Sequence, residues 1–360
     1  MERTYTAQKI LRIYNCNVGR DALVKAEKAG HIPSPSRKQS GSIKTRVWDA
    51  ADLPRIGERY GFLRRPARSL CVAIFTTKGG VLKTTLALNI ARMAALHNLR
   101  TCVVGLDLQG DITSALGFNA DLEDAEDMDA AIERLNSARG LGEVFQKSAG
   151  VLDVVQPTDL PTLFAIPETA DLVALDRGIS ARSRREYWLK EQVIAPLREE
   201  FDLIILDCSP NWNQLISNAL AACDVLVSPL ECKINQFRNL QVFQLLTDEY
   251  RHELRLRYDH IFVPTRFAST RKLSAEIRSW YLANVHGVTH GCIREAVQGE
   301  ESVAAHLSLP EYVPTSLVAD EMRELLKEIW ERMLAVARRT EPYEEGQPTP
   351  PQVFAGEASA

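Results

Sequence analysis

The chain has 360 residues, of which 45% are hydrophobic and 25% are charged, and its formal net charge at pH 7 is −4. These values are ordinary for a water-soluble globular protein with one large domain and a smaller module. They exclude a protein that coats nucleic acid through bulk positive charge, although a local basic patch is compatible with them. No segment reaches the length of a membrane-spanning helix, and the first residues lack the apolar core of a signal peptide, so we expect a cytoplasmic protein.

The composition divides the chain into three parts. Residues 1–65 are basic and helical in pattern, residues 66–340 alternate apolar runs with amphipathic stretches, and residues 341–360 are rich in Pro, Glu and Gly. We predict a small N-terminal domain, a central α/β domain and a disordered tail. An acidic stretch at residues 121–129 predicts an exposed loop or a helix start. The seven cysteines form no Cys-x-x-Cys pair, which favours buried free thiols over an iron–sulfur centre.

The first part has the pattern of a small winged helix-turn-helix domain. We predict a helix over residues 5–11 with Thr6 as its N-cap, a second helix over residues 17–28, and a polar wing over residues 37–46. Basic side chains here are suited to contact DNA phosphates, and Arg20 is the candidate for base recognition. A helical dimerisation arm with a solvated basic face is the alternative. The basic candidates are Arg20, Lys25, Lys28, Arg37, Lys38, Lys44 and Arg46.

The central part predicts a doubly wound, mostly parallel sheet. Apolar runs typical of buried strands are separated by stretches of helical pattern, the first of which covers residues 83–97. The predicted strands are Leu70–Phe75, Thr101–Leu106, Phe201–Leu206, Val225–Pro229 and Ile261–Val263. In such a sheet ligands bind beyond the carboxyl ends of the strands, and three polar motifs of this chain lie at strand ends.

The first polar motif follows the first of these strands and opens a helix. It reads Thr77-Lys78-Gly79-Gly80-Val81-Leu82-Lys83-Thr84-Thr85. Glycines let backbone N–H groups approach phosphate oxygens, and the start of the helix adds partial positive charge. Lys83 can then reach the terminal phosphates, and Thr84 can place its hydroxyl on Mg²⁺. For this segment alone, a Gly-Gly turn with solvated lysines is the alternative.

Two further motifs end the next two strands. The segment from Val103 to Gly110 carries Asp107, and the apolar run Phe201–Leu206 ends at Asp207. A carboxylate near the terminal phosphate can orient an attacking water, and one at the end of a buried strand can hold Mg²⁺ through water. Either aspartate alone is also explained as a cap of a turn, but three such motifs in order are not.

Together the three motifs resemble those of the ParA/MinD superfamily of P-loop ATPases, over roughly residues 68–335. The first resembles the deviant loop Lys-Gly-Gly-x-x-Lys-Thr-Thr/Ser, in which the first lysine, here Lys78, reaches the nucleotide of a dimer partner. The second resembles Asp-x-Asp-Pro-Gln-Gly, in which the second aspartate, here Asp107, positions the attacking water. This chain departs from those motifs at Leu82, where a small residue is usual, and at Gly105, where an aspartate is usual.

The resemblance implies ATP and Mg²⁺ as cofactors, with Lys78, Lys83 and Asp107 as catalytic residues. Thr84 and Asp207 are the implied metal-binding residues, and Pro264 and Thr265 resemble the adenine-side loop of the superfamily. The residues implied to bind the nucleotide are Lys78, Gly79, Gly80, Val81, Leu82, Lys83, Thr84, Thr85, Asp207, Pro264 and Thr265.

Within the superfamily, an N-terminal DNA-binding domain is typical of larger ParA proteins, which partition plasmid or chromosomal DNA. The resemblance implies an ATP-dependent homodimer that binds nucleoid DNA, a ParB-like partner that stimulates hydrolysis, and repression of the partition genes through the N-terminal domain. The candidates for non-specific DNA contact by the central domain are Arg266, Arg271, Lys272, Arg278 and Arg294.

Two alternatives stay open. One is a transcription regulator that senses nucleotide with little turnover, which Leu82 and Gly105 favour. The other is a MinD-like ATPase that positions cargo other than DNA. MinD-like proteins attach to membranes through a basic amphipathic C-terminal helix, and the acidic, proline-containing end of this chain lacks that pattern, so we expect no membrane partner.

Overall fold

The computed structural model describes residues 3–40, 43–118 and 139–339 of the chain. The acidic stretch at residues 121–129 and the tail at residues 341–360, for which the sequence predicts a loop and disorder, lie outside these ranges. None of the described helices is long and apolar enough to cross a bilayer.

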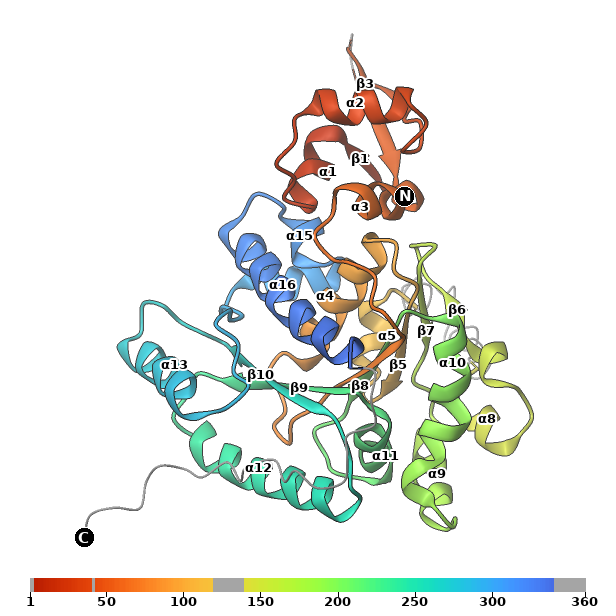
Figure 1. Cartoon of the computed structure of the whole chain (residues 1–360), viewed down its shortest axis with the longest axis vertical. Helices are drawn as coiled ribbons and strands as arrows, with labels where there is room; N and C mark the ends of the chain where they lie inside the picture. The colour runs from red at the N-terminus through yellow and green to blue at the C-terminus, as the bar shows by residue number, and fades with distance from the viewer. Residues whose placement is uncertain (1–2, 41–42, 119–138, 340–360) are drawn as a thin grey trace, which may run out of the picture.

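Within the described residues, seven strands form one sheet at the centre of the molecule (Figure 1). They are β4 (Leu70–Ile74), β5 (Thr101–Leu106), β6 (Gln156–Pro157), β7 (Leu163–Ile166), β8 (Leu203–Cys208), β9 (Val225–Glu231) and β10 (Asp259–Thr265). Their spatial order is β10-β9-β4-β8-β5-β7-β6, and every neighbouring pair is parallel except β6 with β7. The predicted mostly parallel sheet and all five predicted strands are confirmed, whereas β6 and β7 are not predicted by the sequence patterns.

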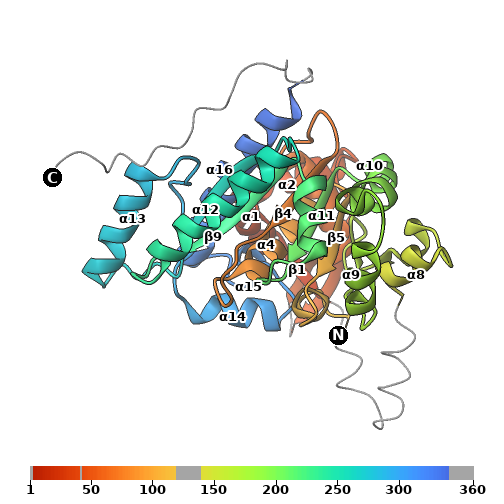
Figure 2. The ribbon, with the colours of Figure 1, turned by 90° about the horizontal axis from the view of Figure 1, so that it is seen from below.

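Helices cover both faces of this sheet (Figures 1 and 2). They are α4 (Lys83–Leu96), α5 (Asp111–Ala115), α8 (Leu141–Gln146), α9 (Leu172–Ser180), α10 (Ala195–Glu200), α11 (Gln214–Ala222), α12 (Gln236–Glu253), α13 (Lys272–Asn284), α14 (Val297–Ala304), α15 (Leu309–Tyr312) and α16 (Leu317–Ala337). Turns of 3-10 helix occupy Ala50–Asp52, Val151–Val154 and Arg185–Tyr187, and a π-helical turn occupies Lys190–Ile194. Because side chains alternate along a strand, Val72 faces one core with α4 and α16, and Ala73 faces a second core with α9, α11 and α12.

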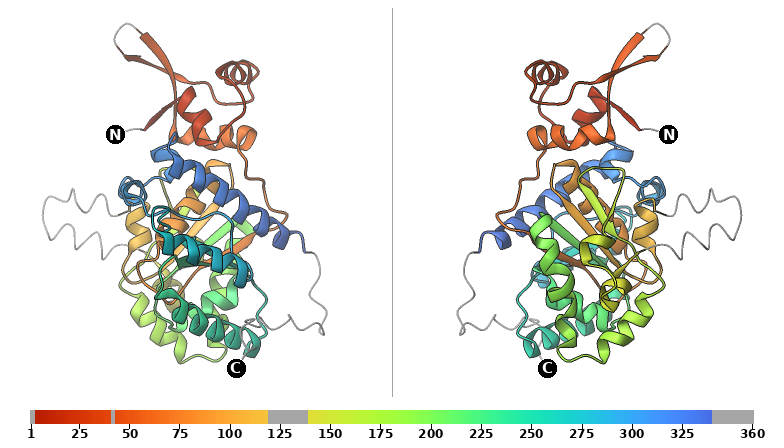
Figure 3. Two further views of the ribbon diagram at one scale, coloured as in Figure 1. Left: turned by 90° about the vertical axis from the view of Figure 1, so that its left-hand side faces the viewer. Right: turned by 90° about the vertical axis from the view of Figure 1, so that its right-hand side faces the viewer.

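The N-terminal part forms a group of short elements at one end of the molecule (Figure 3). These are β1 (Thr4–Thr6), α1 (Ala7–Ile13), α2 (Arg20–Lys28), β2 (Ser36–Ser40), β3 (Ile43–Asp49) and α3 (Leu53–Tyr60), with the strands in the antiparallel order β1-β3-β2. Thr6 caps α1 as predicted, since its Oγ1 accepts a hydrogen bond from Lys9 N at 3.3 Å. The second helix begins at Arg20 rather than at residue 17, because Gly19 is still in an extended conformation.

Helix α4 connects the nucleotide-loop region to the N-terminal part. Its first residue follows the loop predicted to bind phosphate, and at its other end the hydroxyl of Tyr14 donates a hydrogen bond to Leu96 O at 2.9 Å. The next residue, His97, accepts one from Phe62 N at 2.9 Å and donates one to Met93 O at 2.6 Å. Burial lowers the pKa of His97 to about 4, which keeps the ring neutral and able to accept.

Candidate functional site

The segment between β4 and α4 has the backbone conformation of a tight loop that ends in a helix N-terminus. Gly80 has φ +69° and Leu82 has φ +70°, both in the left-handed region. Leucine rarely adopts this conformation, so the loop geometry is one that glycine would satisfy without strain. Leu82 also occupies the N-cap position of α4 and offers no side-chain hydrogen bond there, which leaves the first N–H groups of the helix directed at the loop.

Lys83 lies inside this loop rather than in solvent. Its side chain is 8% exposed, and Nζ donates a hydrogen bond to the carbonyl oxygen of Lys78 at 3.2 Å. Burial lowers its pKa below the ordinary value for lysine, while the charges of Asp207 and Asp107 oppose that shift. An ammonium group held in the loop by one backbone carbonyl has donors left for an anion that enters the loop.

Asp207 is the penultimate residue of β8 and contacts the start of α4. Thr84 donates its hydroxyl to Asp207 Oδ2 at 2.9 Å, and Asp207 Oδ1 is buried with no hydrogen-bond partner among the described residues. Burial raises the pKa of Asp207 to about 8, and the charges of Glu168 and Asp107 add to the increase. An unpaired buried carboxylate oxygen beside a threonine hydroxyl fits a hard divalent cation held directly or through water.

Asp107 stands at the next strand end, after β5. Its Oδ1 accepts a hydrogen bond from Gln109 N at 3.2 Å, which fixes the turn that leads into α5. Asp107, Lys83 and Thr84 line one cavity of about 620 Å³, together with Gly80 and residues of α5. That volume is within the range of small-molecule sites in proteins. The structure therefore brings together the loop and the two aspartates that the sequence predicts at one site.

Lys78 forms an ion pair within its own chain. Its Nζ contacts Glu231 Oε2 at the end of β9, and Glu231 is also paired with Lys233 at 2.6 Å and lies 3.9 Å from Arg266. Although burial alone would raise it, hydrogen bonds from Lys233 and Lys78 hold the pKa of Glu231 below its ordinary value. Glu231 is not among the residues predicted from the sequence, because nothing in its segment marks it as the partner of a lysine far away in the chain.

Glu168 is a second site residue that the sequence reasoning missed. It follows β7, and its Oε2 accepts hydrogen bonds from both the backbone N–H, at 3.1 Å, and the hydroxyl of Thr113 in α5. Its Oε1 is buried with no partner among the described residues. Burial raises the pKa of Glu168 to about 7, and Asp107 adds to this shift through its charge.

On the predicted adenine side, Arg266 and not Pro264 or Thr265 lines the cavity of the loop. Thr265 is fully buried within the sheet, and neither it nor Pro264 lines the cavity of the loop or the neighbouring cavity of about 190 Å³, whereas Arg266 lines both. Arg266 donates a hydrogen bond to Gly80 O at 2.7 Å and pairs with Glu295 at 3.5 Å. This residue, which the sequence suggests as a DNA contact, thus lies against the phosphate loop.

The other residues predicted to contact DNA lie in two places. In the N-terminal part, Arg20 and Lys25 lie on the exposed side of α2, and Arg37 and Lys38 are exposed on β2. Arg46 instead pairs with Glu27 of α2 at 2.5 Å.

The second group lies around the start of α13 and in the loop that precedes α14. Arg271 and Lys272 are exposed at the start of α13, and Lys272 lies 3.6 Å from Glu276. Arg278 donates to His290 O at 2.5 Å, and Arg294 pairs with Glu321 at 2.6 Å. Of these basic side chains, those of Arg271 and Lys272 are therefore the most available to a ligand.

The comparisons with known proteins give the family and the fold of the central part. The family model described as "AAA domain" matches residues 69–256, which include the loop and both aspartates. The chromosome partitioning protein ParA of Myxococcus xanthus is 33% identical over 166 residues, which are 46% of this chain and 53% of the relative. The sporulation initiation inhibitor protein Soj of Bacillus subtilis is 32% identical over 162 residues, 45% of this chain and 58% of the relative. The matched part thus spans little more than half the length of these curated relatives.

A solved structure gives the same result for the fold. Cobyrinic acid a,c-diamide synthase from Mycobacterium smegmatis, crystallised with ADP and magnesium, superposes with a TM-score of 0.57 and 23% identity, covering 73% of this chain and 95% of that one. At this identity the likeness concerns the α/β fold alone.

Proposed function

The chain belongs to the AAA domain family, and on that premise we propose that it binds ATP with Mg²⁺ at the loop between β4 and α4, hydrolyses the ATP slowly, and serves in DNA partition. The observation that carries the proposal is the meeting of Lys83, Thr84 and Asp107 around one cavity, with Asp207 bonded to Thr84. The ends of β4, β5 and β8 are far apart in sequence, yet together they supply a lysine, a hydroxyl group and two carboxylates. These are the functional groups that phosphoryl transfer needs.

In this proposal each residue has a defined task. Backbone N–H groups at Gly79 and Gly80 and the ammonium of Lys83 hold the phosphate oxygens. Thr84 and Asp207 would hold Mg²⁺, and the bound cation would neutralise charge on the phosphates. Asp107 accepts a hydrogen bond from the attacking water and orients it toward the terminal phosphorus.

Lys78 links turnover to dimerisation. In the single chain its charge is neutralised by Glu231. In an ATP-bound homodimer it leaves Glu231 and reaches the nucleotide of the partner, where a positive charge stabilises the transition state. The free-energy cost of this movement is small, because the ammonium group of Lys78 is paired with Glu231 before it and with the phosphates of the nucleotide after it.

DNA is the proposed cargo and a ParB-like protein the proposed partner. The exposed basic residues of α2 and β2 support sequence-directed binding by the N-terminal part as a winged helix-turn-helix, and Arg271 and Lys272 support non-specific binding by the ATP-bound dimer. A protein with these properties would be associated with the nucleoid in the cytoplasm.

The test is ATP hydrolysis by the full chain, with and without duplex DNA and the product of the neighbouring gene. We expect slow turnover that DNA and the partner stimulate, and a loss of roughly 100-fold or more in Lys83→Ala and Asp107→Ala. Asp107→Ala should still bind ATP, because that carboxylate acts on water and not on the phosphates. Lys190→Ala, at an exposed lysine ahead of α10, is the matched control and should leave turnover unchanged.

The same experiment separates the alternative of a nucleotide-sensing regulator. Leu82 favours that alternative. Its bulky side chain borders the cavity, and its backbone is in the left-handed region that leucine rarely adopts. ATP binding without turnover under all of these conditions would contradict hydrolysis and support the regulator.

A further inference from the structure

Gly105 has no side chain, and the space beside it is filled by the carboxyl group of Glu168. In β5, Gly105 lies in register with Asp207 of β8, at the position where the related motif carries its first aspartate. A Cβ atom built on Gly105 would lie 2.2 Å from Cδ and 2.5 Å from Oε1 of Glu168. Atoms do not pack at such distances, so the carboxyl group of Glu168 occupies the space that any side chain at residue 105 would need.

Glu168 reaches this space from a different strand. It lies just beyond β7, which pairs with β5 in parallel with Val104 opposite Ile166. The carboxyl ends of the two strands therefore lie side by side, and the glutamate crosses from one to the other. A carboxylate is thus present beside β5 although the motif on β5 does not carry it.

The contacts of Glu168 connect it to the element that follows Asp107. Oε2 accepts two hydrogen bonds from Thr113, one from its backbone N–H and one from its hydroxyl, and the Thr113 hydroxyl in turn accepts one from Glu168 N at 2.9 Å. Thr113 is in α5, whose first residue follows the turn from Asp107 to Gly110. This clamp fixes α5, and with it the turn that places Asp107.

Besides clamping Thr113, Glu168 places a third acid beside the two aspartates. Two other carboxylates, Asp107 and Asp207, are near enough for their charges to act on one another and on Glu168. A third acid in this place is electrostatically unfavourable, and its Oε1 has no hydrogen bond among the described residues. An apolar side chain would avoid this repulsion but would leave Thr113 without its acceptor, so the acid joins the clamp on α5 to the two aspartates.

We propose that Glu168 is a positioning residue of the nucleotide site, which supplies from the end of β7 the carboxylate that the second motif lacks at Gly105 and holds Asp107 in place through Thr113. This inference rests on the proposed binding of ATP and Mg²⁺ at the same site. It has a specific consequence: an acidic side chain at residue 105 would displace the carboxyl group of Glu168 from its present position against Thr113, because the two compete for one space.

The test is a double-mutant cycle on the full chain with Glu168→Ala, Gly105→Asp and the combined variant. It is read both as ATP turnover and as Mg²⁺-dependent affinity for a non-hydrolysable ATP analogue. We expect Glu168→Ala to lose about 10–100-fold in turnover, as do other residues that orient a metal or catalytic group from behind. Gly105→Asp alone should also lose turnover because two carboxylates are forced into one space. The combined variant should regain most of the loss, since the acid is returned to β5.

Two further variants separate positioning from packing. Glu168→Gln keeps the size of the side chain and removes its charge, and we expect a loss close to that of Glu168→Ala. Glu143→Gln, which lies in α8 away from the cavity, is the matched control and should behave as wild type. Should Gly105→Asp alone fail to fold, the combined variant compared with Glu168→Ala still decides the question.

The outcomes distinguish this inference from the proposed function. If the wild type hydrolyses ATP and the combined variant is no better than Glu168→Ala, or if Glu168→Gln equals the wild type, then the inference is overturned and the ATPase stands. If the wild type does not hydrolyse ATP, the proposed turnover is wrong. The double-mutant cycle measured as affinity for the ATP analogue then tests the role of Glu168. Recovery of Mg²⁺-dependent affinity in the combined variant supports the role of Glu168, and additive losses overturn it.

Discussion

At the scale of single residues, Asp207 makes the stability of the metal-free protein depend on pH. Its folded-state pKa is raised from 3.8 to about 8, so its protonated form stabilises the fold and this contribution is lost as the pH rises toward 8. Glu168, with a pKa of about 7, acts with the same sign. Both contributions begin to be lost near the unfolded-state pKa values of 3.8 and 4.5, and the loss is complete near pH 7 for Glu168 and near pH 8 for Asp207. Below about pH 6.5 the buried histidines act in the opposite direction, so we expect the Tm of the metal-free protein to fall as the pH rises from about 6.5 to 8. Mg²⁺ with ADP should reverse the fall because a bound cation favours the charged carboxylates.

Thermal unfolding across this pH window, with and without Mg²⁺ and ADP, checks the expectation. Asp207→Asn is the informative variant, since the amide cannot ionise and the fall of Tm with pH should become shallower. The buried His97 and His260 have lowered pKa values, and their contribution is lost at lower pH, below about 6.5, so they do not mask the effect. A wild-type Tm that rises through this window to the same extent as that of Asp207→Asn would contradict the assignment.

Some residues around the loop can be predicted from a sequence motif, whereas others are placed there only by the tertiary structure. Lys83, Thr84 and Asp207 are recognisable because they stand at fixed distances from glycines or at the end of an apolar run. Glu168 and Glu231 have no such neighbours in sequence, and their roles depend on contacts with Thr113 and Lys78 that span long stretches of chain. Pairing of this kind is a property of tertiary structure and cannot be obtained from local spacing.

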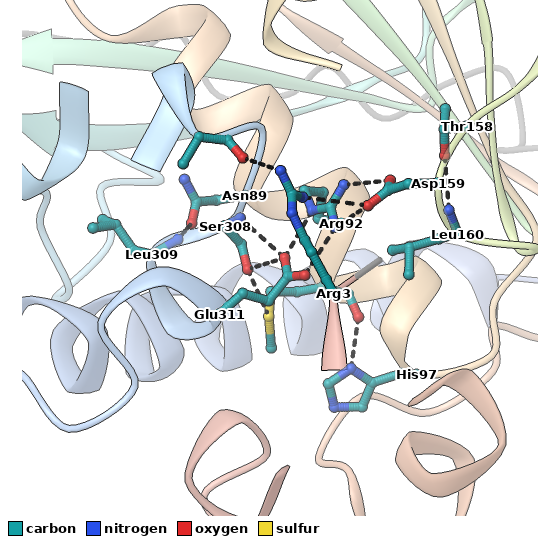
Figure 4. A network of polar contacts seen from close by, with 12 residues as sticks. Arg3, Asn89, Arg92, His97, Thr158, Asp159, Leu160, Ser308, Leu309 and Glu311 are labelled. Atoms are coloured by element: carbon teal, nitrogen blue, oxygen red, sulfur yellow. Dashed lines mark hydrogen bonds and ion pairs between the residues drawn. The ribbon is translucent and has the colours of Figure 1, made fainter. Parts of the chain in front are cut away.

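At the scale of elements, α4 is held by a buried ionic network (Figure 4). Arg92 donates to Glu311 at 2.8 and 2.9 Å and to Asp159 at 2.8 and 3.1 Å, and neither the side chain of Arg92 nor that of Glu311 is exposed. Removal of the arginine would leave a buried carboxylate without its counterion. We expect Arg92→Met to lower the free energy of unfolding by about 3–5 kcal/mol, measured by urea denaturation.

The matched controls for this prediction lie in the same network and on the surface. Arg92→Met/Glu311→Gln removes the uncompensated charge and should recover part of the loss. Lys272→Met breaks an ion pair whose lysine is 92% exposed, and should change the unfolding free energy by less than about 1 kcal/mol. Equal losses in Arg92→Met and Lys272→Met would show that burial of the network is not what stabilises α4.

The elements themselves are predictable where their pattern is long or strongly apolar. The helix predicted over residues 83–97 is α4 (Lys83–Leu96), and the strand predicted over Thr101–Leu106 is β5 with the same bounds. Strand β7 is only Leu163–Ile166, which is too short to display a period and is specified by its pairing with β5. Because the sequence patterns do not predict β7, they cannot place Glu168 at a strand end, and so the missed element and the missed site residue have one cause.

At the scale of the whole molecule, the sequence boundary near residue 65 is not a boundary in packing. One hydrophobic core contains Ile13 and Leu53 of the N-terminal part together with Leu96 of α4 and Trp330 of α16. Trp330 also donates a hydrogen bond to Arg64 O at 2.9 Å. The phosphate loop, α4 and the N-terminal part are thus packed in continuous sequence, with the N-terminal part at the opposite end of α4 from the loop.

The exposed basic residues of the N-terminal part give the last prediction. Arg37 and Lys38 on β2 and Lys44 on β3 are exposed on a hairpin that extends away from the sheet of the central part (Figure 3). If they bind phosphates, the triple variant Arg37→Ala/Lys38→Ala/Lys44→Ala should bind duplex DNA more weakly. The slope of log K against log salt should then decrease in size by about 0.9 for each phosphate that the variant no longer neutralises. ATP affinity should not change, since the hairpin is remote from the loop.

The double variant Arg271→Ala/Lys272→Ala is the comparison: it should affect only the DNA binding that requires ATP. Salt titrations of both variants, with and without ATP, would contradict DNA binding by the N-terminal part if the hairpin variant kept the wild-type slope.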